Sequence, residues 1–365
     1  MKIKPIFLIL YCFVAVFLTG CTSIFIHKDE PMVVADSDDA LATIVSYGFL
    51  TTGIVEDISS DGNQLLLLSG SPYHNISLLN LTDSGKLISL INSDKTEENA
   101  VFSMDQKNIF YIESTEKDTE NNKQYQLFSS TLDKSSVVAI SASDEDIDPV
   151  FCLNGNGVIY SYERTFVFAD PISEEQTKYT LDNDYMIHQL FYDSETHILF
   201  FLANASSEES TMTNLYAIDF EDQSSSKTIT PALLATNIVD FEYQGSLYYI
   251  QSRNNSRTII KAELSGTKIS VTHELYSGNL ASLKSTSDSN ILLFTKYLDQ
   301  NNQSLRSIWT LNIQTEEAKQ LTSPQVLDSK IITNPNQNIL YFSVEDPPVN
   351  GIPISNIMRV EYKTE

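Results

Sequence analysis

The chain has 365 residues and a formal net charge of −25, because 48 acidic residues outnumber 23 basic ones. This excess argues against a nucleic-acid partner, since Lys and Arg side chains that neutralise phosphate carry such binding. It also argues against adhesion to anionic lipid through a basic surface. The acidic surface promotes solubility, and attraction of cationic partners is the alternative interpretation.

The first twenty residues have the pattern of an export signal. Lys2 and Lys4 precede the apolar run "PIFLILYCFVAVFLTG", which is short for a membrane-spanning helix. The run ends in Leu18-Thr19-Gly20-Cys21, which resembles the lipobox of bacterial lipoproteins at every position. The resemblance implies cleavage before Cys21, attachment of diacylglycerol to its thiol and acylation of its new amine. An uncleaved anchor, or a secretory signal with a chance cysteine, is the alternative.

This interpretation divides the chain into a signal peptide at 1–20, a lipidated tether at 21–40 and a folded domain at 41–365. Removing two lysines and no acidic residue changes the formal charge from −25 to −27. Acyl chains such as palmitate then provide the membrane contact. Thr22, with no Asp at that position, resembles the outer-membrane sorting pattern. We therefore expect a location in the bacterial cell envelope, on the periplasmic side of the outer membrane if the organism has one.

The domain keeps a single cysteine, Cys152, so it can form no intrachain disulfide. Cys152 lies in an apolar strand pattern, where a buried free thiol is common. No surrounding motif indicates a catalytic nucleophile.

Apolar runs recur along the domain. They begin at Leu65, Ile109, Val158, Ile198, Leu247, Ile291 and Ile339, at spacings of 44, 49, 40, 49, 44 and 48 residues. A short strand and a polar turn precede each run, as in "DISSDGNQ", "VFCLNGNG" and "IITNPNQN". A third strand pattern follows each run, and most units continue into a fourth. Seven units of antiparallel strands indicate a β-propeller, in which neighbouring sheets bury each other's faces.

The seventh unit ends without a fourth strand, whereas "ALATIVSYGF" at 40–49 precedes the first unit as an unassigned strand. We therefore expect that this N-terminal strand completes the last sheet and closes the ring. The predicted fold is all-β: a seven-bladed propeller of four-stranded antiparallel blades, with six or eight blades as alternatives. Nothing in the pattern indicates assembly, so a monomer is expected.

The third unit, "ISASDEDIDPVFCLNGNGVIYSY", resembles the repeat of the TolB propeller family. "EDISSDGNQLLLL" and "ITNPNQNILYFS" are similar in part. The resemblance covers about 54–365, but no unit keeps the full Ser-Pro-Asp-Gly turn of that family, and only the first keeps Ser-Asp-Gly. It therefore implies the architecture rather than a particular partner.

Acidic residues in two settings raise the possibility of a metal site. Asp144, Asp146 and Asp148 have the spacing that begins a calcium loop, but Pro149 and Gly155 stand where a glycine and a glutamate are needed. Inner strands of a propeller converge on its axis, and five residues near their starts are candidate channel residues: Asp57, Asp148, His188, Asp240 and Lys330. Val101, Lys284 and Ile331 occupy equivalent positions, so the candidates form no uniform ring.

These observations favour a non-enzymatic scaffold that binds an envelope protein or glycan, with no cofactor and no resident metal. The alternative is a hydrolase or lactonase in which axial carboxylates and His188 hold a divalent cation. No phosphate loop, dinucleotide fingerprint or hydrolase elbow occurs in the sequence.

Overall fold

A computed structural model gives the structure of the protein. It describes residues 42–70, 75–82, 85–116, 123–143, 147, 150–153, 157–205, 213–221, 228–254, 256–298, 305–327, 330–349 and 352–363. The chain separates into two compact units, Met1–Val34 and Ala35–Glu365, and all described residues belong to the second. The predicted signal peptide, Cys21 and the tether lie outside the described residues.

The described residues form strands and no helix. The strands are β1 (Ile44–Thr52), β2 (Ile54–Ile58), β3 (Gln64–Ser69), β4 (Asn75–Asn80), β5 (Leu87–Ser89), β6 (Thr96–Phe102), β7 (Asn108–Glu116), β8 (Lys123–Thr131), β9 (Val137–Ser143), β10 (Val150–Cys152), β11 (Val158–Tyr162), β12 (Thr165–Asp170), β13 (Glu175–Leu181), β14 (Tyr185–Asp193), β15 (Ile198–Ala205), β16 (Thr213–Asp219), β17 (Thr228–Ile229), β18 (Ala232–Tyr243), β19 (Leu247–Arg253), β20 (Ser256–Ser265), β21 (Lys268–Gly278), β22 (Leu280–Ser285), β23 (Ile291–Tyr297), β24 (Leu305–Asn312), β25 (Ala318–Gln320), β26 (Gln325–Val326), β27 (Ile332–Thr333), β28 (Ile339–Val349) and β29 (Ile352–Tyr362). All-β architecture, predicted from the sequence, is confirmed for this part of the chain. Within the described part, no helix is long and apolar enough to cross a membrane.

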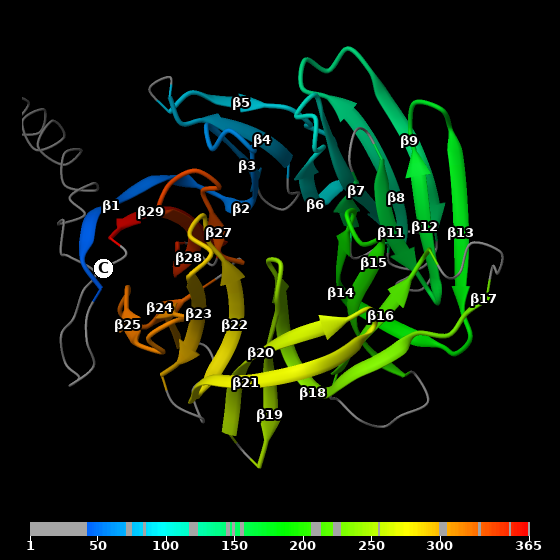
Figure 1. Cartoon of the computed structure of the whole chain (residues 1–365). Coiled ribbons are helices and arrows are strands. Elements are labelled where there is room, and N and C mark those ends of the chain that lie inside the picture. The colour runs from blue at the N-terminus through cyan, green and yellow to red at the C-terminus, as the bar shows by residue number, and fades with distance from the viewer. Residues whose placement is uncertain are drawn as a thin grey trace, which may run out of the picture. The chain divides into compact units, whose positions relative to one another are not determined.

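The strands belong to six hydrogen-bonded sheets (Figure 1). Their orders are β2-β3-β4-β5, β6-β7-β8-β9, β10-β11-β12-β13-β17, β14-β15-β16-β18-β19-β20-β21, β22-β23-β24-β25 and β1-β29-β28-β27. The second strand of each sequence unit lies inside its sheet and packs on both faces, so it is a continuous apolar run rather than an alternating one. Leu65, Leu66, Leu67 and Leu68 of β3 are all buried in this way.

The seven-stranded sheet differs from the prediction of separate four-stranded units. Strand β18 pairs with β16 from Ala232 to Ile238, and with β19 from Ile238 to Tyr243. One long strand therefore serves as the outer strand of the fourth unit and the first strand of the fifth. Asn237, next to the shared residue Ile238, has a φ of 59°, a left-handed conformation that Asn tolerates better than most residues. The sequence gives no boundary here because no turn separates the segments.

The N-terminal strand β1 pairs antiparallel with β29, from Ile44 opposite Tyr362 to Thr52 opposite Asn356. Figure 1 shows this contact between the blue start and the red end of the coloured chain. The last sheet is therefore ordered β27-β28-β29-β1 from first to outer strand. This is the strand pairing that the sequence predicts.

The first strands of the sheets are neighbours in chain order. Strand β2 contacts β6, β6 contacts β10, β10 contacts β14, β18 contacts β22, β22 contacts β27, and β27 contacts β2. The side-chain amide of Gln189 on β14 donates to the carbonyl of Phe241 on β18, at 2.9 Å. Apolar clusters fill the space between adjacent sheets; one contains Val55, Leu65 and Leu67 of the first sheet with Ile339, Tyr341 and Ile357 of the last. Burial of each such side chain stabilises the fold by about 1.5–3 kcal/mol.

The turns between first and second strands are also hydrogen-bonded to one another. Asn334 Nδ2 donates to the carbonyl of Gly62 at 3.1 Å, and Asn336 Nδ2 donates to that of Ser60 at 3.1 Å. The backbone N–H of Ser60 donates in turn to Gln106 Oε1 at 3.1 Å. Gly62 has a φ of +73°, and a Cβ there would lie 2.6 Å from the Asn334 amide. Glycine at position 62 is therefore required for the close contact of this turn with the last sheet.

Candidate functional site

Two of the predicted channel residues, Asp57 and Asp240, bind backbone amides of the next sheet. Asp57 Oδ2 on β2 accepts a hydrogen bond from the N–H of Phe102 on β6 at 2.8 Å, and its Oδ1 accepts one from Ile58 at 2.8 Å. Asp240 Oδ2 on β18 accepts from the N–H of Leu283 on β22 at 2.7 Å, and its Oδ1 accepts from Phe241 at 2.8 Å. Both carboxylates therefore connect adjacent first strands.

Glu242 forms a third connection of the same kind. Its Oε2 accepts from the hydroxyl of Ser285 at 2.8 Å and from the N–H of Ser285 at 3.3 Å. Its Oε1 lies 3.0 Å from Lys284 Nζ. Glu242 and Asp57 each lie two residues before their turn, which begins at Gln244 or Ser59, so they occupy equivalent positions in their units.

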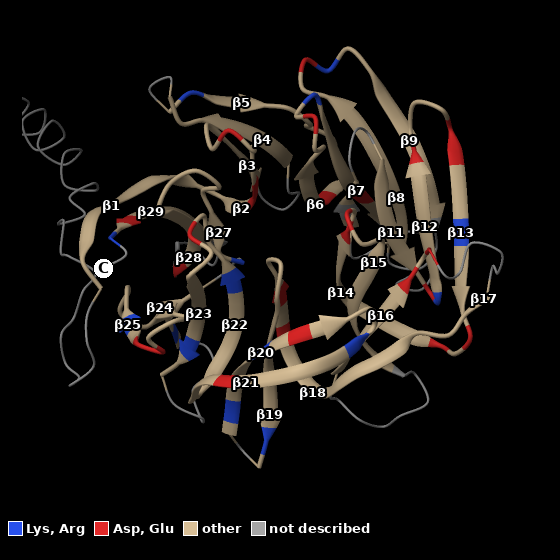
Figure 2. Cartoon of the chain, in the orientation of Figure 1, with Lys and Arg blue, Asp and Glu red and all other residues tan. Residues whose placement is uncertain are grey.

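Lys284 is the cation that contacts Glu242. Glu242 raises the pKa of the Lys284 ammonium above its ordinary value, and Asp240 and Asp57 add to the effect against the opposing influence of burial. Lys284 therefore stays protonated and partly balances three carboxylates. In Figure 2, β22 carries a basic segment and β2 an acidic one.

Glu56 and Lys330 extend this group of charges. Burial raises the pKa of the Glu56 carboxyl, whereas Lys330, whose Nζ lies 3.9 Å from Glu56 Oε2, lowers it. We call Glu56, Asp57, Asp240, Glu242, Lys284 and Lys330 the inner-strand cluster. It holds four carboxyl groups and two ammonium groups.

Burial also dominates the protonation of the two connecting aspartates. It raises the pKa of Asp57, although the N–H of Phe102 and the charge of Lys330 act in the opposite direction. It raises the pKa of Asp240 to about 7, with the hydrogen bond from Leu283 opposing and the charge of Glu242 reinforcing the shift. A fraction of Asp240 is therefore protonated near neutral pH.

Asp148 and His188 are the two remaining predicted channel residues. Asp148 lies outside the described residues. His188 on β14 has an exposed side chain, and its Nε2 contacts Asn204 Oδ1 on β15. Among the described residues, no group of three or more His, Cys, Asp or Glu side chains is arranged to hold a metal ion.

Cys152 on β10 is a free thiol and partly buried. Burial raises its pKa well above the ordinary value, and the negative charge of Asp57 adds to the shift. A thiol in this state stays protonated and is a poor nucleophile.

Glu242 and Glu56 were missed by the sequence analysis, and Lys284 was treated only as an interruption of the acidic ring. Aligning the units on their turns places Glu242 at the position equivalent to Asp57, so the sequence contained this signal. The pairing of Glu56 with Lys330 gave no such signal, because 274 residues separate them in the chain. Chemically, the cluster can hold sheets together and take up a proton at Asp240.

Comparison with known proteins supports the fold. No family model matches the sequence, and no curated protein matches it. Among solved structures, an oligogalacturonate lyase from Vibrio parahaemolyticus is 14% identical, with a TM-score of 0.58 over 87% of this chain and 98% of that one. An oligogalacturonate lyase in complex with manganese is 11% identical, with a TM-score of 0.59 over 89% and 98%. The β-propeller domain of Cps50 (Swd1) from Myceliophteria thermophila is 10% identical, with a TM-score of 0.59 over 87% and 100%. At these identities the likeness shows a β-propeller fold alone.

Proposed function

We propose that the protein is a lipid-anchored β-propeller of the bacterial cell envelope that binds a protein or glycan partner and catalyses no reaction. One observation carries the non-enzymatic part of the proposal. Three carboxylates of the inner-strand cluster, Asp57, Asp240 and Glu242, already bind backbone amides or Lys284. Such side chains stabilise the sheets and are poorly placed to ligate a cation or activate water.

The proposal includes seven blades and a ring closed by β1. The cyclic neighbourhood of β2, β6, β10, β14, β18, β22 and β27 supports this arrangement, as does the pairing of β1 with β29. In this scheme the seven-stranded sheet is two blades joined through β18. Closure by an outer strand from the other end of the chain protects an edge that would otherwise be unpaired.

The lipid anchor rests on the lipobox at Leu18 to Cys21. Growth with a labelled fatty acid tests it directly: the wild-type protein should incorporate label and fractionate with membranes, whereas Cys21→Ala should do neither. Label on the Cys21→Ala protein, or an unlabelled wild-type protein, contradicts the anchor.

Affinity capture tests the scaffold itself. The full-length protein, extracted from the envelope in mild detergent at physiological salt, should retain a defined protein or glycan in constant ratio over repeated purifications. A matched lipid-anchored protein of unrelated fold should not retain it. Repeated recovery of the protein alone contradicts a scaffold.

A second candidate function is metal-dependent cleavage of an acidic oligosaccharide. The structural likeness to an oligogalacturonate lyase in complex with manganese favours it, although that likeness extends only to the fold. Incubation of the purified protein with oligogalacturonate and Mn²⁺ should give no unsaturated product if the scaffold proposal is correct. Product formation that is lost in Asp148→Asn and His188→Ala would establish the enzyme instead.

A further inference from the structure

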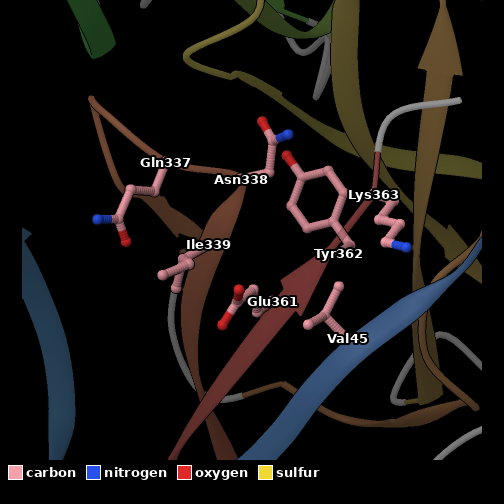
Figure 3. A pocket seen from close by; sticks show the side chains of 7 residues that line it. All are labelled: Val45, Gln337, Asn338, Ile339, Glu361, Tyr362 and Lys363. Carbon is pink, nitrogen blue, oxygen red and sulfur yellow. The ribbon is translucent and has the colours of Figure 1, made fainter.

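A pocket of about 600 Å³ lies where β1 meets the end of β29. Its lining residues come from three places in the chain: Val45, Gln337, Asn338, Ile339, Glu361, Tyr362 and Lys363. Figure 3 shows Gln337 and Lys363 on opposite sides of this set, with Tyr362 between them. The volume falls within the range of about 300–1,000 Å³ that is usual for small-molecule sites.

Glu361 is a positioned anion in this pocket. Its Oε2 accepts hydrogen bonds from Arg359 Nη2 at 2.9 Å and from Ser46 Oγ at 3.1 Å, and Arg359 Nη1 donates to Ser46 Oγ at 2.7 Å. These bonds to Arg359 and Ser46 lower the pKa of Glu361, so the carboxylate is ionised near neutral pH. Two of these bonds end on Oε2 of Glu361 and the third connects Arg359 to Ser46, so Oε1 can accept a hydrogen bond from a ligand.

The other lining groups provide donors, acceptors and an apolar wall. Gln337 is exposed and Asn338 is partly buried, and each amide both donates and accepts. Lys363 is exposed, and its backbone N–H donates to the carbonyl of Thr43 at 2.9 Å. Val45, half of which is exposed to solvent, supplies the apolar surface, whereas Ile339 lines the pocket but is only 4% exposed.

This combination restricts the class of ligand. The lining holds one carboxylate and one ammonium, so its formal charge is zero. A cation would be repelled by Lys363, and the Glu361 carboxylate that would attract it is already paired with Arg359. An anion would be repelled by Glu361 and by the net charge of −25 on the chain. Hydroxyl groups donate to a carboxylate and accept from amide and ammonium groups, whereas ring C–H surface packs on Val45.

We propose that this pocket binds a neutral, hydroxyl-rich sugar unit of a glycan. The inference rests on the proposed function, because it names the glycan arm of that scaffold and its binding site. Since Val45 and Ser46 belong to β1, an occupied pocket also stabilises the paired state of β1.

Binding of defined disaccharides to the detergent-solubilised full-length protein tests the proposal. The compounds are cellobiose, maltose and N,N′-diacetylchitobiose as neutral probes and digalacturonate as the acidic one, each titrated by calorimetry or ligand-observed NMR. At least one neutral disaccharide should bind. Glu361→Gln and Gln337→Ala should each weaken its binding about tenfold, which corresponds to about 1.4 kcal/mol. Glu317→Gln and Gln314→Ala, exposed on the β24–β25 turn, are matched controls that should leave the affinity unchanged.

Gln337→Ala changes an exposed side chain, so it keeps the test valid even if Glu361→Gln alters stability. Binding of no neutral disaccharide, binding of digalacturonate alone, or equal affinity in wild type and both pocket variants overturns the proposal. A partner retained in affinity capture despite these results would leave the scaffold intact and refute only the sugar site. If no neutral disaccharide binds and affinity capture retains no partner, both the sugar site and the scaffold are refuted.

Discussion

The carboxylate of Asp57 accepts a hydrogen bond from the backbone N–H of Phe102, 45 residues further along the chain and on the next sheet. The carboxylate of Glu242 makes a similar connection to the backbone N–H of Ser285. The two donors, Phe102 and Ser285, each lie one residue before the turn of their own unit. A repeated position thus serves a repeated structural purpose. Acids that suggested metal chemistry in the sequence connect neighbouring strands in the structure.

Replacing Asp57 by alanine should lower the free energy of unfolding by about 1–3 kcal/mol, because the N–H of Phe102 loses its acceptor in a partly buried position. Urea denaturation measures the change. Asp184→Ala is the control, since Asp184 and its partner Arg164 are exposed and such pairs contribute about 0–1 kcal/mol. Equal effects of the two substitutions would contradict the structural role of Asp57.

Asp240 should make stability depend on pH. Its folded pKa of about 7 exceeds the ordinary value of 3.8, so the folded state binds more protons than the unfolded state between these values. The contribution of Asp240 to stability is therefore largest below pH 4 and decreases as the pH rises to about 7. Comparing wild type with Asp240→Asn isolates this contribution: the difference between their unfolding free energies should change across pH 4–7 and be constant above pH 8. A difference that does not vary with pH would contradict it.

Lys284→Met should destabilise the protein more than the removal of an exposed charge, because it leaves Glu242 and Asp240 without their neighbouring cation. We expect a loss of about 2 kcal/mol in unfolding free energy, less than the about 3–5 kcal/mol of a fully buried ion pair, because the Lys284 side chain is 35% exposed. Adding Glu242→Gln should recover part of the loss, since one uncompensated carboxylate is then removed. If the loss of unfolding free energy in the double variant equals the sum of the losses in the two single variants, Lys284 and Glu242 are not coupled.

Deletion of residues 41–48 removes most of β1 and exposes the edge of β29. The melting temperature should fall by at least about 5 °C, because a change of 1 kcal/mol corresponds to about 2–4 °C in a domain of this size. Thermal unfolding followed by circular dichroism checks this. An unchanged melting temperature would contradict ring closure by the N-terminal strand.

Strand positions were predictable where the chain repeats itself. The run from Leu65 and the pattern "TFVFAD" at 165–170 correspond to observed strands because strongly apolar or alternating segments have few alternatives. The pairing of β1 with β29 was predictable from a count of strands. The fusion through β18 was not predictable, because Ile238 pairs with both neighbouring strands and no turn motif separates the two pairings.

The candidate site was predicted only in outline. Asp57 and Asp240 do lie on first strands beside neighbouring sheets, as their positions at the start of each unit indicated. Their partners are backbone amides, which carry no sequence signal. The pocket at Glu361 was also invisible in the sequence, since it joins Val45 to residues about 290 or more positions away.

Titration with Mn²⁺ distinguishes whether the inner carboxylates connect the sheets or ligate a metal ion. The full-length protein is treated with EDTA, and its melting temperature is then measured with increasing Mn²⁺, in wild type, Asp57→Asn and Asp148→Asn. If the carboxylates connect the sheets, Mn²⁺ should not raise the wild-type melting temperature, and metal analysis should find less than one ion per chain. A saturable rise of several degrees, lost in the Asp148→Asn or Asp57→Asn protein, would contradict that role of the carboxylates.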